Sequence, residues 1–84
     1  MKPPKTNIQE ILYTLIENGE VSIMDYPYLS SFRTRCSDLN LKHGLEFKTI
    51  SRTRRNKFNR PYSYAVHKLA NKEQAIKLYN QLNQ

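Results

Sequence analysis

This sequence has very little cysteine and no long apolar run, and each shortage excludes a class of protein. The single cysteine, Cys36, excludes an internal disulfide and any zinc site built from several cysteines. No stretch approaches the roughly 20 consecutive apolar residues that cross a bilayer. The N-terminal residues also lack the apolar run of a signal peptide, because Glu10 and Glu17 interrupt it. We therefore expect a soluble protein of the cytoplasm with no membrane partner.

Acidic residues are missing from residues 48–72, although this segment holds eight Lys and Arg residues. Residues 1–47 carry five such cations against six acids, and residues 73–84 carry one of each sign. The net charge of the chain, +7, therefore comes from one contiguous segment. A concentrated positive field favours a polyanionic partner, and nucleic acid is the commonest one.

The length of the chain predicts one small domain with a helical start. With 84 residues it can bury only a modest core, which leaves little room for an enclosed substrate cavity. Residues 1–6 form a short polar tail. Apolar residues at helical spacing then predict a helix over 7–18, with Asn7 or Thr6 as its N-cap and Gly19 at its end.

Further elements are predicted on either side of the central stretch. Residues 20–22 are typical of one short rung of sheet. Residues 23–26 predict a truncated second helix, because Pro27 makes the residue before it a poor place to continue a helix. A last helix over 72–82, with Asn71 as its N-cap, is predicted from capping and apolar spacing. This C-terminal segment, residues 70–84, either packs on the domain or mediates a homodimer.

The central stretch begins with a predicted helix over residues 30–43, which Gly44 closes. Successive steps of 100° place Cys36, Leu39 and His43 close to Phe32, so these four residues form its expected buried stripe. On this stripe a cysteine behaves as a small hydrophobic residue. Neither histidine belongs to a nucleophile–base motif or a metal-binding spacing, so we expect no enzyme activity, no metal and no cofactor.

The opposite side of this helix is polar throughout. Ser30 or Ser31 is the expected N-cap. The residues on the polar side can all donate or accept hydrogen bonds, and they are Ser30, Arg33, Thr34, Ser37 and Asn40. Arginine suits guanine and asparagine suits adenine, so this side has the chemistry of base recognition, although an ordinary solvated helix also carries such residues. Arg35 lies on a flank, where it either holds a phosphate or pairs with Asp38.

A hairpin is predicted next, with strands over 45–50 and 62–69. The connection over 51–61 is too long for a tight turn, which predicts an extended, projecting loop into which the strands continue only some way. Imperfect alternation near Ile50 suggests a bulge or twist there. The cations of the loop are Arg52, Arg54, Arg55, Lys57 and Arg60. We expect this loop to grip phosphates.

The order helix, short strand, short helix, helix and hairpin is that of a winged helix-turn-helix domain. The residues Leu29 to Leu39 and His43 to Thr49 carry the match. They resemble the small winged helix domains of bacteriophages and prophages, whose third helix has the pattern Arg-hydrophobic-Ser-Asp-Leu, soon followed by Gly-Leu and an alternating strand. The resemblance covers roughly residues 7–69. The shortened second helix and the C-terminal helix depart from it.

The resemblance implies an α+β fold, with a three-helix core and a two-stranded hairpin as its wing. It also implies double-stranded DNA binding in a bacterial or phage-infected cell, by a small transcriptional regulator or a recombination accessory factor such as an excisionase. The third helix would enter the major groove and the wing would contact the backbone or the minor groove. The candidate contacts are Ser30, Ser31, Arg33, Thr34, Arg35, Ser37, Asn40, Arg52, Arg54, Arg55, Lys57 and Arg60.

Two other functions stay open at this point. The same basic hairpin suits structured RNA, which proteins recognise by shape and by its 2′-hydroxyls. Winged helices also serve as docking modules, so a host protein is an alternative partner. The DNA hypothesis requires that the basic loop and the polar side of the helix lie on the same side of the molecule.

Overall fold

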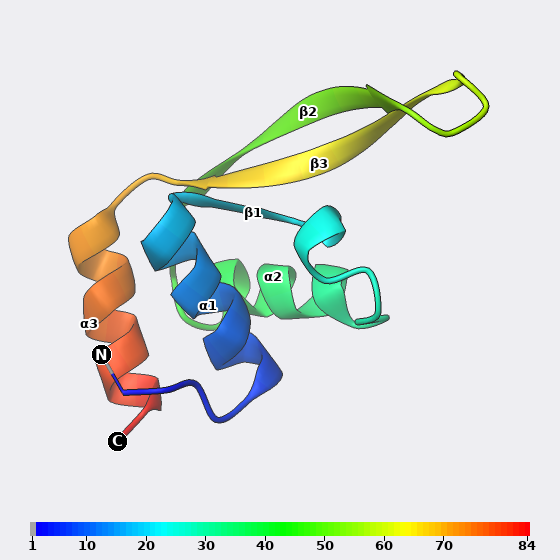
Figure 1. The fold of residues 1–84 in the computed structure, drawn as a ribbon. Coiled ribbons are helices and arrows are strands. Elements are labelled where there is room, and N and C mark those ends of the chain that lie inside the picture. The colour runs from blue at the N-terminus through cyan, green and yellow to red at the C-terminus, as the bar shows by residue number, and fades with distance from the viewer. Residues whose placement is uncertain (1) are drawn as a thin grey trace.

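The computed structural model describes residues 2–84 as a helical body from which a long hairpin projects (Figure 1). Its elements in chain order are α1 (Asn7–Asn18), β1 (Glu20–Ser22), the 3-10 turn η1 (Ile23–Asp25), α2 (Phe32–Leu41), β2 (Phe47–Arg55), β3 (Pro61–Leu69) and α3 (Lys72–Leu82). Within the described residues the fold is α+β, with three α-helices and an antiparallel three-stranded sheet in the order β1-β3-β2. This arrangement is compatible with a small winged-helix-like domain.

Helix α1 forms one wall of the core. Its N-cap is Thr6, whose hydroxyl accepts a hydrogen bond from the Gln9 amide at 3.3 Å, and Gly19 ends it in the left-handed conformation with φ of 76°. The buried apolar residues of α1 pack against residues from α2, β1 and α3. The core they share comprises Ile11, Leu12, Leu15, Ile16, Val21, Tyr26, Phe32, Cys36, Leu39, Leu45, Ala75, Leu78 and Tyr79.

Helix α3 belongs to this core. Tyr79 has no exposed surface, and its ring lies edge-on to Tyr13 of α1 with 5.7 Å between centroids. The Asn71 side chain caps the helix by accepting from the Gln74 amide, as predicted. The Gln74 side chain in turn donates to the carbonyl of Gly44 and accepts from the amide of Glu46, so α3 also holds the loop between α2 and β2.

Helix α2 is shorter than the predicted helix over 30–43. Ser31 occupies the N-cap position but makes no side-chain capping bond, and the helix ends at Leu41. His43 was expected on the buried stripe, and this prediction is wrong, because His43 is exposed. The chain leaves the helix with Gly44 at φ of 67°, and the Leu45 amide donates to the Leu39 carbonyl. Leu45 therefore fills the core position instead of His43.

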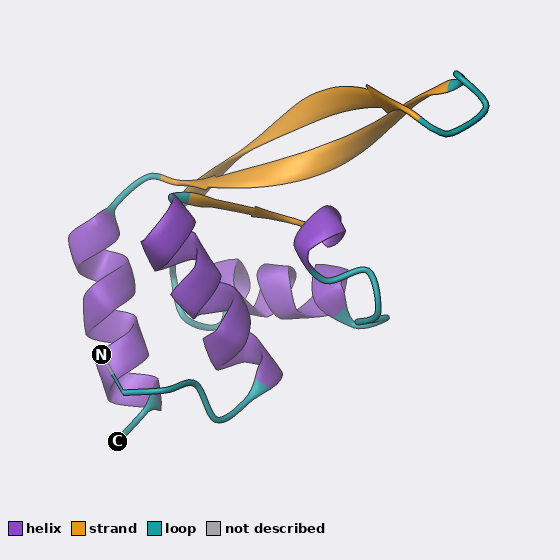
Figure 2. Ribbon diagram, viewed as in Figure 1, coloured by secondary structure: helices purple, strands orange, loops and turns teal. Residues whose placement is uncertain are grey.

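The hairpin is a continuous two-stranded ribbon rather than a long loop (Figure 2). The pairing runs unbroken from Phe47 opposite Leu69 to Arg55 opposite Pro61. The predicted loop over 51–61 is therefore wrong in extent, because only residues 56–60 form the turn. Of the bulge or twist suggested near Ile50, the bulge is wrong, since Ile50 lies directly opposite Val66 in regular register. Threonine and tyrosine favour strands, which explains why pairing continues through this charged segment.

The turn itself is organised by Asn56. Its side-chain oxygen accepts hydrogen bonds from the amides of Phe58 and Arg60 at 2.9 and 3.0 Å. Asn59 adopts a left-handed conformation with φ of 62°, which asparagine tolerates better than most residues. The ribbon and this turn extend the molecule to 45 Å along its longest axis, against 23 and 21 Å along the others.

The packing of α3 predicts that Tyr79→Ala lowers the free energy of unfolding by about 3–5 kcal/mol, because the substitution leaves a large cavity in the core. Chemical denaturation monitored by circular dichroism measures this change. The matched control is Asn80→Ala, an exposed position on the same helix, which should change stability by no more than about 0.5 kcal/mol. A loss below about 1 kcal/mol for Tyr79→Ala would show that α3 contributes little to the core.

Candidate nucleic-acid interface

The unbroken register sorts the hairpin side chains onto two faces, because residues directly opposite each other in an antiparallel pair point the same way. The inner face turns toward the helices, as the His67 ring shows: it lies 4.9 Å from the Phe47 ring and 6.3 Å from the Phe32 ring of α2, between centroids. Beyond Phe47, the β2 residues of the inner face are Thr49, Ser51, Thr53 and Arg55. The β2 residues of the outer face are Lys48, Ile50, Arg52 and Arg54.

A hollow lies between α2 and the inner face of the hairpin. Its walls come from α2 on one side and from β2 and β3 on the other, namely Arg33, Cys36, Ser37, Asn40, Phe47, Ala65 and His67. An adjoining depression continues along the hairpin, and Arg33 lines both. The hairpin residues that line this depression are Thr49, Ile50, Ser51, Ser63, Tyr64 and Ala65. The fold thus brings part of the polar side of α2 together with a row of hydroxyl groups on the hairpin.

The other candidate residues at the start of α2 and along it differ in exposure and in the contacts they make. Ser30 and Thr34 are exposed, while Ser31 is half-buried. Asn40 lines the hollow, but its side-chain amide donates to the Leu45 carbonyl at 3.1 Å, so part of its hydrogen-bonding capacity is used within the fold. Arg35 is placed elsewhere: it pairs with Asp38 at 3.5 Å and lies beside the start of α1.

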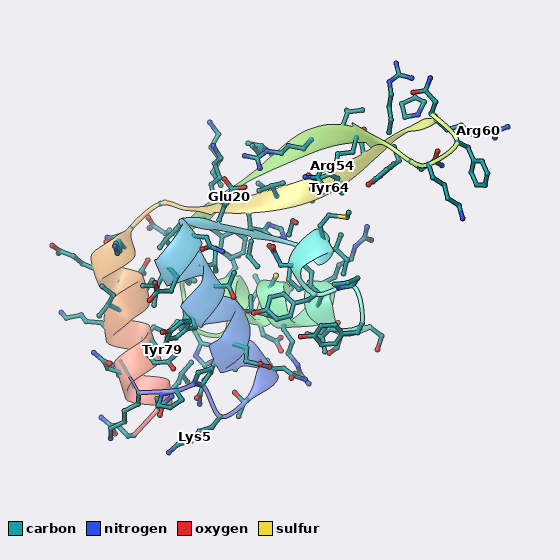
Figure 3. The ribbon with its side chains drawn as sticks, in the orientation of Figure 1. Lys5, Glu20, Arg54, Arg60, Tyr64 and Tyr79 are labelled. Atoms are coloured by element: carbon teal, nitrogen blue, oxygen red, sulfur yellow. The ribbon has the colours of Figure 1, made fainter. Side chains whose placement is uncertain are left out.

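The hairpin cations are divided between the two faces and the turn. Arg52 and Arg54 lie on the outer face, whereas Arg55 lies on the inner face, where its guanidinium donates to the Asn59 carbonyl at 3.0 Å. Lys57 and Arg60 belong to the turn, and Figure 3 shows Arg60 at the far end of the hairpin. Strand alternation therefore turns Arg52 and Arg54 away from α2, whereas Arg55 lies on the face toward it.

Arg52 is the hairpin cation most strongly held by the protein itself. Its guanidinium donates two hydrogen bonds to the Glu20 carboxylate of β1, at 2.6 and 3.1 Å. These bonds and the charge of Glu20 raise the pKa of Arg52, which keeps the guanidinium charged. An exposed bidentate pair of this kind adds little stability but fixes the side chain across the sheet. Arg52 is consequently less free to bind a phosphate than the cations nearer the turn.

Several residues of this surface were not predicted from the sequence. Lys48 and Lys68 lie opposite each other on the outer face, and the inner hydroxyls of Thr53 and Ser63 are 3.2 Å apart. If the alternation of side chains between the two faces of a strand is continued through residues 48–55, it predicts both the outer lysine and the inner hydroxyls. On α2, Leu41 is 78% exposed on the outward side. The same 100° steps that placed Thr34 would have predicted that position.

The tyrosines before α2 have separate roles, which the sequence had left open. Tyr26 is buried, and its hydroxyl lies 2.6 Å from that of Thr14 and donates to the Glu10 carbonyl at 2.9 Å. Tyr26 therefore anchors the segment before α2 to α1. Tyr28 is exposed beside it, with its ring edge-on to that of Tyr26.

Cys36 and His67 are held by packing rather than poised for chemistry. Burial raises the pKa of the Cys36 thiol to about 12, which opposes formation of the reactive thiolate. Burial also lowers the pKa of His67, because the charged imidazolium is disfavoured there. Within residues 2–84, no group of three or more His, Cys, Asp or Glu residues is placed to hold a metal ion. None of the helices in this range has the length and apolar character needed to cross a membrane.

The environment of His67 predicts a pH-dependent stability. Since the pKa of His67 in the folded chain lies below its ordinary value near 6.5, the unfolded chain binds a proton first as the pH falls. This contribution to stability is complete above about pH 6.5 and is lost as the pH falls toward the folded pKa. Denaturation midpoints measured between about pH 7.5 and pH 5.5 should therefore fall more steeply for the wild type than for His67→Gln.

The control for this experiment is His43→Gln, since His43 is the other histidine and is exposed. Its stability profile should follow that of the wild type. Parallel profiles for the wild type and His67→Gln would contradict the placement of His67 between the two phenylalanine rings.

No model of a known protein family, no curated protein and no solved structure matches this chain. Its function is therefore inferred from the geometry and charge of its own residues.

Proposed function

We propose that this chain is a non-enzymatic, double-stranded DNA-binding protein of the winged-helix type, with α2 as the recognition helix and the hairpin as the wing. The observation that carries the proposal is the position of the charge. Residues 48–72 contain eight cations and no acid, and seven of them lie on the projecting hairpin (Figure 1). Of these seven, Arg55 lies on the face toward α2, and Lys57 and Arg60 lie at the turn. Duplex DNA is the partner with dense phosphate charge and a groove for a helix.

The order of elements supports the winged-helix assignment. A helix, a short strand, a truncated second helix and a third helix precede the hairpin, and β1 completes the sheet by pairing with β3. In this assignment η1 stands for most of the second helix. The helix-turn-helix pair is then η1 and α2, and the hollow between α2 and the ribbon faces the DNA.

On α2, base contacts are assigned to exposed side chains, of which Arg33, Ser37 and Asn40 line the hollow. Arg33 is the candidate for a bidentate contact with guanine, and Thr34 and Ser37 can each donate to or accept from a base edge or a phosphate. The side-chain amide of Asn40 donates to the Leu45 carbonyl, so Asn40 contributes its side-chain oxygen to the contact with DNA. The exposed Leu41 side chain is suited to an apolar contact with a thymine methyl group.

On the hairpin, backbone contacts are assigned first to Arg55 and to the turn residues Lys57 and Arg60. The turn is held by the Asn56 side chain, so these cations start from a defined backbone. Each phosphate that they neutralise releases bound counterions, which favours binding at low salt. The inner hydroxyls of Ser51, Thr53 and Ser63 supply neutral donors along the same side.

The packing of helix α3 indicates whether the protein binds DNA as a monomer or as a dimer. Its apolar residues Ala75, Leu78 and Tyr79 are buried in the core of the same chain. The exposed residues of α3 are polar, namely Lys72, Glu73, Lys77, Asn80 and Gln81. We therefore expect a monomer on a short asymmetric site rather than a dimer formed through α3, which suits a phage-type regulator or a recombination accessory factor.

Removing the two turn cations tests the proposal. We expect Lys57→Gln with Arg60→Gln to weaken binding to a mixed-sequence DNA duplex and to lower the slope of log affinity against log salt by about 1.8, since each lost phosphate contact removes about 0.9. Fluorescence anisotropy across a salt series measures both quantities. Lys77→Gln, an exposed cation on α3, should leave them unchanged.

An unchanged salt slope in the double variant would show that the turn does not contact DNA phosphates. A duplex RNA of matched length and sequence, used as the competitor, should displace the DNA poorly, because α2 cannot enter the deep and narrow major groove of A-form RNA. Displacement at equal concentration would favour RNA as the partner instead.

A further inference from the structure

The outer face of the sheet is a second surface with its own chemistry. It points away from the inner face, whose His67 ring lies 6.3 Å from the Phe32 ring of α2 between centroids. Of its residues, Val66 and Ser22 are buried although they lie outside the main core cluster. The face is made of Glu20 and Ser22 from β1, Lys48, Ile50, Arg52 and Arg54 from β2, and Tyr62, Tyr64, Val66 and Lys68 from β3.

Two tyrosines occupy successive outward positions on β3. The rings of Tyr62 and Tyr64 are 6.2 Å apart between centroids and tilted by 36°. Arg54 lies directly opposite Tyr62, and Arg52 lies directly opposite Tyr64. Figure 3 shows Arg54 and Tyr64 together midway along the ribbon. Aromatic rings in a row along a strand, flanked by cations, are the arrangement on which successive unpaired bases stack.

The cations of this face are not balanced by its one acid. The Glu20 carboxylate is occupied by its two hydrogen bonds with Arg52. Lys48 lies directly opposite Lys68, and like charges at opposed positions repel each other. Within residues 2–84, Lys48, Lys68 and Arg54 form no ion pair. A bound phosphate chain would relieve the repulsion between the two lysines.

We propose that this outer face binds single-stranded nucleic acid, with bases stacked on Tyr62 and Tyr64 and phosphates held by Lys48, Lys68 and Arg54. A duplex would not use the tyrosines in this way, because its bases are already stacked and paired. The register turns the tyrosines away from the hollow beside α2, although Tyr62 and Tyr64 also border a neighbouring depression that Phe32 and Arg33 line. The inference does not depend on the proposed duplex binding. Because the register turns the tyrosines and the inner hydroxyls to different faces of one ribbon, the protein can hold a duplex and a displaced strand together.

The test uses a fluorescent oligothymidylate of about ten nucleotides, within the usual site size for such surfaces, and two tyrosine variants of the full chain. Tyr62→Leu with Tyr64→Leu removes the aromatic faces but keeps apolar side chains, and it should weaken oligonucleotide binding at least about tenfold. Tyr62→Phe with Tyr64→Phe keeps the rings and should stay within about twofold of the wild type.

A charge variant provides an independent measurement. Lys48→Gln with Lys68→Gln should lower the salt slope of oligonucleotide binding by about 1.4, since each phosphate contact on a single strand contributes about 0.7. Circular dichroism and thermal melting of every variant report whether the fold is kept. If the leucine variant does not fold, the salt slope of the lysine variant decides the question. The control is again Lys77→Gln.

Duplex binding, measured in parallel, separates this inference from the proposed function. Loss of oligonucleotide binding in the folded leucine variant, with duplex binding retained, supports a separate single-strand site. Wild-type oligonucleotide affinity in that variant, equal losses in the leucine and phenylalanine variants, or an unchanged salt slope in the lysine variant would each overturn the inference. Duplex binding that is absent from the wild type would overturn the proposed function and leave this inference standing.

Discussion

The unbroken register between β2 and β3 is the constraint on which the proposed surfaces depend. Each strand of the hairpin has nine residues, and the pairing continues without a bulge from the helical body to the turn. Because side chains alternate between faces, this register places the hydroxyls of Ser51 and Thr53 on one side and the guanidiniums of Arg52 and Arg54 on the other. A shift of one residue would exchange the two sets.

The orientation of α2 relative to the ribbon depends on a small group of packed residues. His67 lies between the Phe32 and Phe47 rings, which joins the start of α2 to the base of both long strands. Leu45 is buried beside them, and Gln74 of α3 holds the backbone on either side of it. These contacts keep Arg33 at the edge of the hollow, so recognition would depend on the core as well as on the exposed residues.

Much of this arrangement could be predicted from the sequence. Apolar spacing and capping residues gave the bounds of the first and last helices, and the stripe of Phe32, Cys36 and Leu39 is buried as predicted. The extent of the hairpin was not predicted, because a run of charged residues is more typical of a loop. The backbone of this run is nevertheless paired along the whole ribbon. The two-sided placement of the cations was missed for the same reason. The pairing of Arg52 with Glu20 joins residues far apart in the chain and left no local signal.

The proposed duplex binding is tested most directly by adding a mixed-sequence DNA duplex and mapping, by NMR, the backbone amides whose chemical shifts change. The duplex account predicts perturbations along α2 from Arg33 to Leu41 and in the turn over residues 56–60, with α3 unaffected. Perturbations confined to the outer face or to α3, with α2 unchanged, would contradict it.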